Sequence, residues 1–199
     1  MRYIQLIFTG LCVVLMASAV MAKDKKAEKS MDPQAMMEVY TKLATPGEQH
    51  KQLASLTGSW TTKTKEWIEP NKPPVDSTGS AEMKMLLDGR FLQQELTGQM
   101  MGQPFSGIEI TAYDNLLKHY VTTWMSTMGT GIFMMEGTAS ADGQTITLKG
   151  QHAEPGGGYM KHRAVWKIVD SNTQRFDMYG THRGGKEWKM MEITYTRKQ

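Results

Sequence analysis

Cysteine is nearly absent from the sequence, because Cys12 is the only one among 199 residues. Cys12 lies within an apolar N-terminal run and follows Leu11 rather than a small residue, so it is not expected to be a lipoprotein acceptor. A chain that loses this N-terminal segment has no thiol. Disulfide bonds, thiolate metal sites and cysteine nucleophiles are then excluded together.

An excess of charge of one sign is also lacking. The chain has 23 Lys and Arg residues against 20 Asp and Glu residues, which gives a formal net charge of +3. Binding to nucleic acid or to an anionic membrane generally requires a strongly basic surface. The composition therefore predicts neither partner. A length of 199 residues fits one domain with a substantial core and does not suggest a second domain.

The usual signatures of nucleophilic catalysis are missing as well. The sequence contains no Gly-x-Ser-x-Gly nucleophile elbow and no pair of carboxylates at a suggestive spacing. We therefore assign no catalytic residue from the sequence. A hydrolase or an isomerase on this chain would have only the scattered Glu66, Glu192 and His182 to use.

The first 22 residues have the pattern of a secretory signal peptide. Arg2 supplies an early positive charge, an apolar run follows over residues 4–16, and small residues lead up to Ala22. The run is shorter than the roughly 20 residues that a membrane-spanning helix needs, so an uncleaved anchor is the weaker alternative. We expect cleavage after Ala22, a periplasmic or secreted protein, and no stable membrane anchor afterwards. Residues 23–31 are polar and charged, and are expected to form a disordered leader.

Two short helices are predicted within residues 32–57. Asp32-Pro33 has the form of an N-cap followed by a first helical position, and Thr45-Pro46 repeats this signal at the start of a second helix. The apolar faces of both helices are too narrow for a helical bundle. We therefore expect the two helices to form a plug or lid on the domain that follows.

From Gly58 to the C-terminus the sequence predicts strands and turns only. The strand-like runs cover residues 61–69, 79–87, 90–99, 105–113, 116–125, 131–138, 144–154, 159–169, 175–183 and 186–197. The Asp-Gly pairs at residues 88–89 and 142–143 are the strongest hairpin signals. Consecutive antiparallel strands without intervening helices leave exposed edges unless the first and last strands pair. The expected fold class is therefore all-β, an up-and-down antiparallel barrel of about ten strands over residues 58–199, with a two-sheet sandwich as the alternative.

The alternation of charged and apolar residues assigns an inner face to several strands. Trp60 is expected to plug one end of the barrel, since it follows the bend-forming Gly58. The last strand is expected to direct Glu192 inward. The runs over residues 105–113 and 116–125 are ambiguous and are left unassigned. The residues expected to face the cavity and contact an apolar ligand are Trp60, Met160, Trp166, Phe176, Met178, Trp188 and Met190.

Three of the five histidines are predicted to gather at one end of the barrel. Hairpin pairing through the turns sets His152 opposite or diagonal to His162, and brings His162 near His182. Such a group could hold zinc, copper or haem iron, or orient a polar ligand. The alternative is that all three are solvated rim residues, because a register error of one residue would scatter them.

Three segments of the sequence resemble a known bacterial family. They are HKQLASLTGSW at residues 50–60, YDNLLKHYVTTWMSTMGTGIF at residues 113–133 with MEGT close behind, and MMEITYTRK at residues 190–198. Over roughly residues 46–198 the chain resembles the family designated domain of unknown function 1579. That family is similar in plan to the calycins, which include lipocalins and fatty-acid-binding proteins, and more loosely to haem-binding nitrobindins. Met125-Ser126 stands where the family pattern has an acidic residue after Trp124. The resemblance implies a fold and no catalytic residues.

Together these features predict a protein that binds a small, mostly apolar molecule without catalysing a reaction. The alternatives are a metal or haem protein that uses the three histidines, a hydrolase or isomerase on the same scaffold, and a structural partner protein whose barrel is solidly packed. The sequence indicates no particular cofactor and no oligomeric state.

Overall fold

The computed structural model describes residues 32–100, 102–182 and 184–199. The predicted signal peptide (residues 1–22) and the predicted leader (residues 23–31) lie outside the described residues. None of the helices within the described residues has the length and apolar character needed to cross a bilayer.

Two helices precede the strands. The first, α1 (Pro33–Ala44), begins as predicted, with the Asp32 side chain as its N-cap. The second, α2 (Glu48–Ala54), begins later than predicted, because Gly47 rather than Thr45 is its N-cap. Thr45 instead forms the C-cap of α1.

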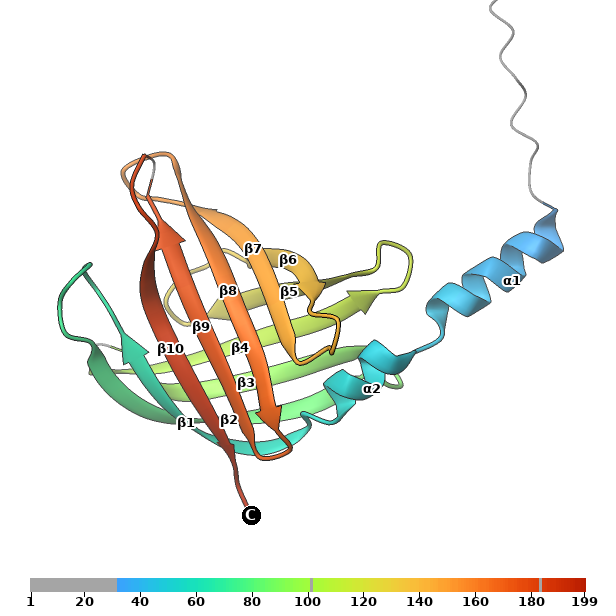
Figure 1. Cartoon of the computed structure of the whole chain (residues 1–199), viewed down its shortest axis with the longest axis horizontal. Coiled ribbons are helices and arrows are strands. Elements are labelled where there is room, and N and C mark those ends of the chain that lie inside the picture. Colours follow the sequence, from blue (N-terminus) through green and yellow to red (C-terminus); the bar gives the residue numbers. More distant parts are fainter. Residues whose placement is uncertain (1–31, 101, 183) are drawn as a thin grey trace, which may run out of the picture.

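Only α2 closes the barrel. Figure 1 shows α2 lying across one end of the barrel while α1 points away from it. Leu53 of α2 is fully buried and His50 is nearly so, whereas no residue of α1 is buried. The prediction of a plug made of both helices is therefore correct for α2 and wrong for α1. A contact between α1 and the barrel is the hydrogen bond from the Asn115 side chain to the Leu43 carbonyl.

The strands form one closed antiparallel barrel, in which each strand pairs with its neighbours in the chain and β10 pairs with β1. The strands are β1 (Gly58–Glu66), β2 (Val75–Leu86), β3 (Phe91–Met100), β4 (Gln103–Asp114), β5 (His119–Ser126), β6 (Phe133–Ala139), β7 (Thr145–Ala153), β8 (Tyr159–Asp170), β9 (Thr173–Thr181) and β10 (Trp188–Arg197). The predicted number of strands and their order are confirmed. The sandwich alternative is wrong, because pairing of β1 with β10 removes both sheet edges.

Trp60 and its neighbours seal the end of the barrel nearest α2. The indole is fully buried, and its Nε1 donates a hydrogen bond of 3.0 Å to the Leu56 carbonyl. The Arg197 guanidinium lies 4.2 Å from the centre of the ring. These two contacts of Trp60 connect the segment between α2 and β1 with the C-terminal strand β10. They close the end of the barrel and also stabilise the junction where β1 pairs with β10.

The inner faces predicted for β1, β7 and β8 are confirmed, and that of β9 is confirmed as far as Gly180. The prediction fails at His182, which lies beyond β9 and is exposed, and at Glu192 of β10. A register shift between Lys189 and Met191 interrupts the pairing of β10 with β9. An extra residue in one strand breaks the two-residue alternation. Met191 and Ile193 therefore line the interior, and Glu192 points outward.

Candidate functional site

The barrel encloses a cavity of about 990 Å³. The cavity begins above the sealed end and extends toward the hairpins at the opposite end, where Met128 and Pro155 contribute to its lining. Its volume lies at the upper end of the roughly 300–1,000 Å³ that small-molecule sites occupy in proteins. The alternative of a solidly packed barrel is therefore not supported.

The cavity wall is mainly apolar. Aromatic rings, thioethers and aliphatic side chains from seven strands surround it, and they are Leu96, Phe105, Trp124, Phe133, Met135, Trp166, Phe176, Met178, Met191 and Ile193. The Trp166 indole is fixed by a hydrogen bond of 2.9 Å from its Nε1 to the buried Gln174 side chain. A wall of this composition is suited to an apolar molecule.

Part of the cavity floor is polar. It is formed by Thr62 on β1, Gln94 on β3, Glu109 on β4 and Tyr195 on β10. The next inward-facing residues toward α2, such as Trp60 and Thr111, are buried and do not line the cavity. By the same criterion Trp166 and Phe176 also lie at the deepest level, since Ile168 and Gln174 beyond them are buried outside the cavity, so the four polar residues form one part of the floor.

Glu109 has the most perturbed environment among the floor residues. Burial raises the pKa of its carboxyl group from 4.5 to about 7, although the hydrogen bond donated by the Thr111 hydroxyl opposes this shift. Tyr195 is only 4% exposed, and burial together with the nearby Glu109 carboxylate raises the pKa of its phenol. Strongly perturbed titratable groups inside a cavity are typical of functional sites.

The structure distributes the predicted ligand-binding residues over three locations. Trp166, Phe176 and Met178 line the cavity wall. Trp60 lies below the cavity floor in the sealed end. Met160 and Met190 pack together in the space beside Gly180, and Trp188 lies next to His182, so these three residues do not line the cavity.

The floor residues Gln94, Glu109 and Tyr195 were not predicted from the sequence. On β4 the apolar residues Ile108 and Ile110 alternate with Glu109, so hydrophobic patterning alone would direct the isoleucines inward. The structure directs Glu109 inward, paired in register with Gln94 of β3 and Trp124 of β5. The available signal was the alternation of polar and apolar residues along residues 105–113, a run whose inner face was left unassigned.

Two of the three predicted histidines meet near the cavity mouth. His152 Nδ1 lies 2.7 Å from His162 Nε2, and both residues line the cavity. Burial and the neighbouring His152 lower the pKa of His162 to about 4, so His162 is neutral near pH 7. The Phe133 ring packs edge-on against both imidazoles. The prediction that His152 lies opposite or diagonal to His162 is confirmed, and the arrangement is diagonal.

His182 does not complete a three-histidine site. It lies beyond the end of β9, and its Nδ1 pairs with the Glu154 carboxylate at 2.7 Å. The contact between His152 and His162 occupies one ring nitrogen of each, and His162 Nδ1 is buried without a partner. Over the part of the chain that the structure describes, no group of three or more His, Cys, Asp or Glu side chains is placed to hold a metal ion.

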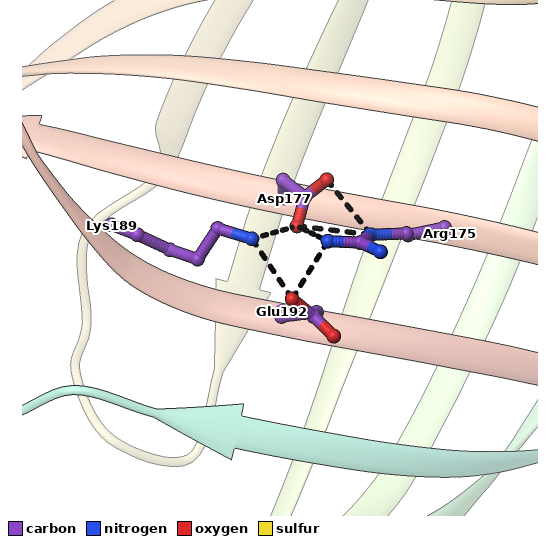
Figure 2. Close-up of polar contacts among 4 residues, drawn as sticks. All are labelled: Arg175, Asp177, Lys189 and Glu192. Atoms are coloured by element: carbon purple, nitrogen blue, oxygen red, sulfur yellow. Dashed lines mark hydrogen bonds and ion pairs between the residues drawn. The ribbon is translucent and has the colours of Figure 1, made fainter. Parts of the chain in front are cut away.

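Glu192 belongs to an ion-pair network on the outer surface. Figure 2 shows Arg175 and Asp177 of β9 bridged to Lys189 and Glu192 of β10. The Lys189 ammonium lies 2.7 Å from Asp177 and 2.8 Å from Glu192. The three residues that a hydrolase or isomerase would have used are therefore separated, with Glu66 lining the cavity, His182 paired to Glu154 and Glu192 on the outside.

These observations define a calycin-like protein, a closed meander barrel with one sealed end and an internal cavity. The family described as "Protein of unknown function (DUF1579)" matches residues 45–197, and the chain belongs to this family.

Comparison with solved structures gave two matches, of which the first supports the fold. The crystal structure of Rv2717c from M. tuberculosis is similar, with a TM-score of 0.56, 14% sequence identity, and coverage of 78% of this chain and all of that one. A redesigned β-barrel matches with a TM-score of 0.39 at 16% identity, covering 74% of this chain and 95% of the design. A search of the curated proteins found no match.

Proposed function

We propose that this protein binds a small, mostly apolar molecule inside its barrel, without catalysing a reaction, in the periplasm or outside the cell. The observation that carries the proposal is the cavity of about 990 Å³ with an apolar wall. Burial of apolar ligand surface against this wall is favourable by roughly 25 cal/mol per Å² removed from water. A preformed cavity adds to affinity, since the protein does not have to be ordered on binding.

Uptake of a neutral solvatochromic dye, N-phenyl-1-naphthylamine, tests this proposal. The dye fluoresces more strongly and at shorter wavelength in an apolar environment, so a saturable increase at one dye per chain is expected. A variant that enlarges one side chain of the wall, Leu96→Trp, should change both the affinity for the dye and the intensity of its emission, because Leu96 lines the cavity. The matched control is Leu116→Trp, which introduces the same indole at a turn residue that is 67% exposed.

Dye fluorescence that is equal in the wild type, Leu96→Trp and Leu116→Trp would place the dye outside the cavity and contradict the proposal. Circular dichroism of both variants separates loss of uptake from loss of folding.

A further inference from the structure

The polar part of the cavity floor differs chemically from the apolar wall. Gln94 is 7% exposed, Tyr195 is 4% exposed and Thr62 is 2% exposed, so three polar side chains are more than nine-tenths buried beside the Glu109 carboxyl. Burying polar groups is unfavourable unless each finds a partner. A floor of this kind is suited to the polar end of a molecule whose remainder contacts the apolar wall.

The orientation of Glu109 opposes the ordinary preference of a half-buried strand. Ile108 is 41% exposed on the outer surface while the carboxyl group of Glu109 faces the cavity. Turning the strand over would bury the isoleucine and hydrate the carboxylate. Local arrangements that oppose the hydrophobic pattern are concentrated at functional sites.

Within the described part of the chain, the cavity lining carries no permanent positive charge. Among the described residues that line it, the titratable side chains are Glu109 and Tyr195 at the floor, and Glu66, His152 and His162 higher up. None of these lining residues is a lysine or an arginine. The cavity therefore offers no fixed cation to a carboxylate or phosphate, and it offers a carboxyl group to a cation.

We propose that the cavity floor anchors the protonated amine of an amphiphilic ligand, with Glu109 as its counter-ion and the apolar tail against the wall. This inference rests on the proposed function and names its ligand class. Gln94 and Tyr195 supply oxygen atoms that can accept further hydrogen bonds from the ammonium group. Charge-assisted hydrogen bonds of this type are stronger than neutral ones, particularly away from bulk water.

Binding of an amine should strengthen as the pH rises. The pKa of Glu109 is raised to about 7 by burial, so the carboxyl group changes from mostly neutral to mostly ionised around that pH. The groups that face it are Gln94 from β3, Trp124 from β5, Tyr195 from β10 and Thr111 from its own strand. Of these only Tyr195 titrates, and its pKa is raised further above the neutral range.

The test compares decylamine, decanol and decanoate, which share an alkyl chain and differ in charge. Isothermal titration calorimetry on the whole protein, below the critical micelle concentrations, measures each affinity near pH 8. We expect decylamine to bind about 10- to 100-fold more tightly than decanoate. Decylamine should also bind more weakly at about pH 6, where Glu109 is largely protonated.

Glu109→Gln is the decisive variant, because it keeps the shape and removes the charge. It should weaken decylamine binding about 10-fold or more, remove most of the pH dependence and leave decanol affinity within about threefold. Glu66→Gln makes the same change at another carboxyl group that lines the cavity, and should leave the preference for the amine intact.

The outcomes separate the two proposals. Failure of all three compounds to bind would contradict the proposed function itself. Binding of all three with similar affinity, or a preference for decanoate, would overturn the amine proposal and leave the function standing. Loss of the amine preference in Glu66→Gln but not in Glu109→Gln would also overturn it. Because decanol reports folding and cavity access in each variant, a misfolded protein is recognised directly.

Discussion

At the scale of single residues, ionisation of Glu109 makes the stability of the protein depend on pH. Its pKa is about 7 in the folded protein against an ordinary value of 4.5. The folded state therefore holds this proton more tightly than the unfolded state. The stability linked to it is present below pH 4.5 and is lost as the pH rises through about 7.

We therefore expect Glu109→Gln to become more stable than the wild type as the pH rises. At about 1.4 kcal/mol per pKa unit, the free energy of unfolding of the variant should gain up to about 3 kcal/mol on the wild type between about pH 4.5 and pH 8. Urea unfolding of both proteins at several pH values measures this difference in the free energy of unfolding. The contributions of the other titratable groups cancel, because both proteins contain them. Parallel stability curves for the two proteins would show that Glu109 is not perturbed.

Two glycines on the inner face of the barrel differ in what surrounds them. A Cβ atom at Gly137 would meet the backbone of Thr147 and Leu148, whereas a Cβ at Gly180 would meet the flexible ends of Met160 and Met190. Gly137→Ala should lower the free energy of unfolding by about 3 kcal/mol, and Gly180→Ala by about 1 kcal/mol. Denaturant titration of both variants checks the order, and equal losses would contradict the packing described around them.

At the scale of elements, Arg197 stabilises the junction of β1 and β10, where the barrel closes. Its guanidinium donates hydrogen bonds to the carbonyl oxygens of Ser55, Thr57 and Ser171, and lies over the Trp60 ring. One side chain on β10 therefore connects the chain between α2 and β1 with the turn between β8 and β9.

Arg197→Lys keeps the charge but loses the planar fork that makes these contacts. We expect it to lower the free energy of unfolding by about 1–3 kcal/mol. The matched control is Lys198→Ala, because the ammonium of Lys198 lies 3.8 Å from Glu82 at the surface and should contribute little. A thermal melt of each variant gives the comparison, and an unchanged midpoint for Arg197→Lys would contradict the assigned role.

The two helices should contribute very differently to stability. Leu53→Ala in α2 removes a fully buried side chain and should cost about 2–5 kcal/mol. A chain that starts at Thr45 lacks α1, which has no buried residue. Its free energy of unfolding should therefore lie within about 0.5 kcal/mol of that of the full-length protein. Chemical denaturation of both proteins measures this, and a large loss on removing α1 would reveal contacts that the fold does not explain.

At the scale of the whole molecule, the N-terminal segment predicts export. Protein recovered from the periplasm of a bacterial expression host should begin at Lys23, because cleavage is expected after Ala22. Intact-mass spectrometry gives the mature N-terminus, and Ala22→Arg should block processing at that site. Recovery of the full-length chain in the cytoplasm would contradict the prediction.

The barrel as a whole was predictable from local chemistry. Asp-Gly pairs and regular alternation determine where the chain turns and where it extends, since both depend on neighbouring residues only. The charged residues on β1 and β7 to β9 also determined which side of each strand faces inward. The absence of intervening helices was sufficient to indicate that β1 would pair with β10.

The cavity floor was decided by the tertiary structure. In a closed barrel the face of each strand is set by hydrogen-bond register with two neighbours, so Gln94 and Trp124 orient Glu109 although Ile108 is the more apolar residue. In the same way the irregular pairing of β10 with β9 directs Glu192 outward, where the alternation had predicted it inside. Sequence pattern records the average preference of each residue for water, whereas closure of the ring requires all ten strands to satisfy their pairing together.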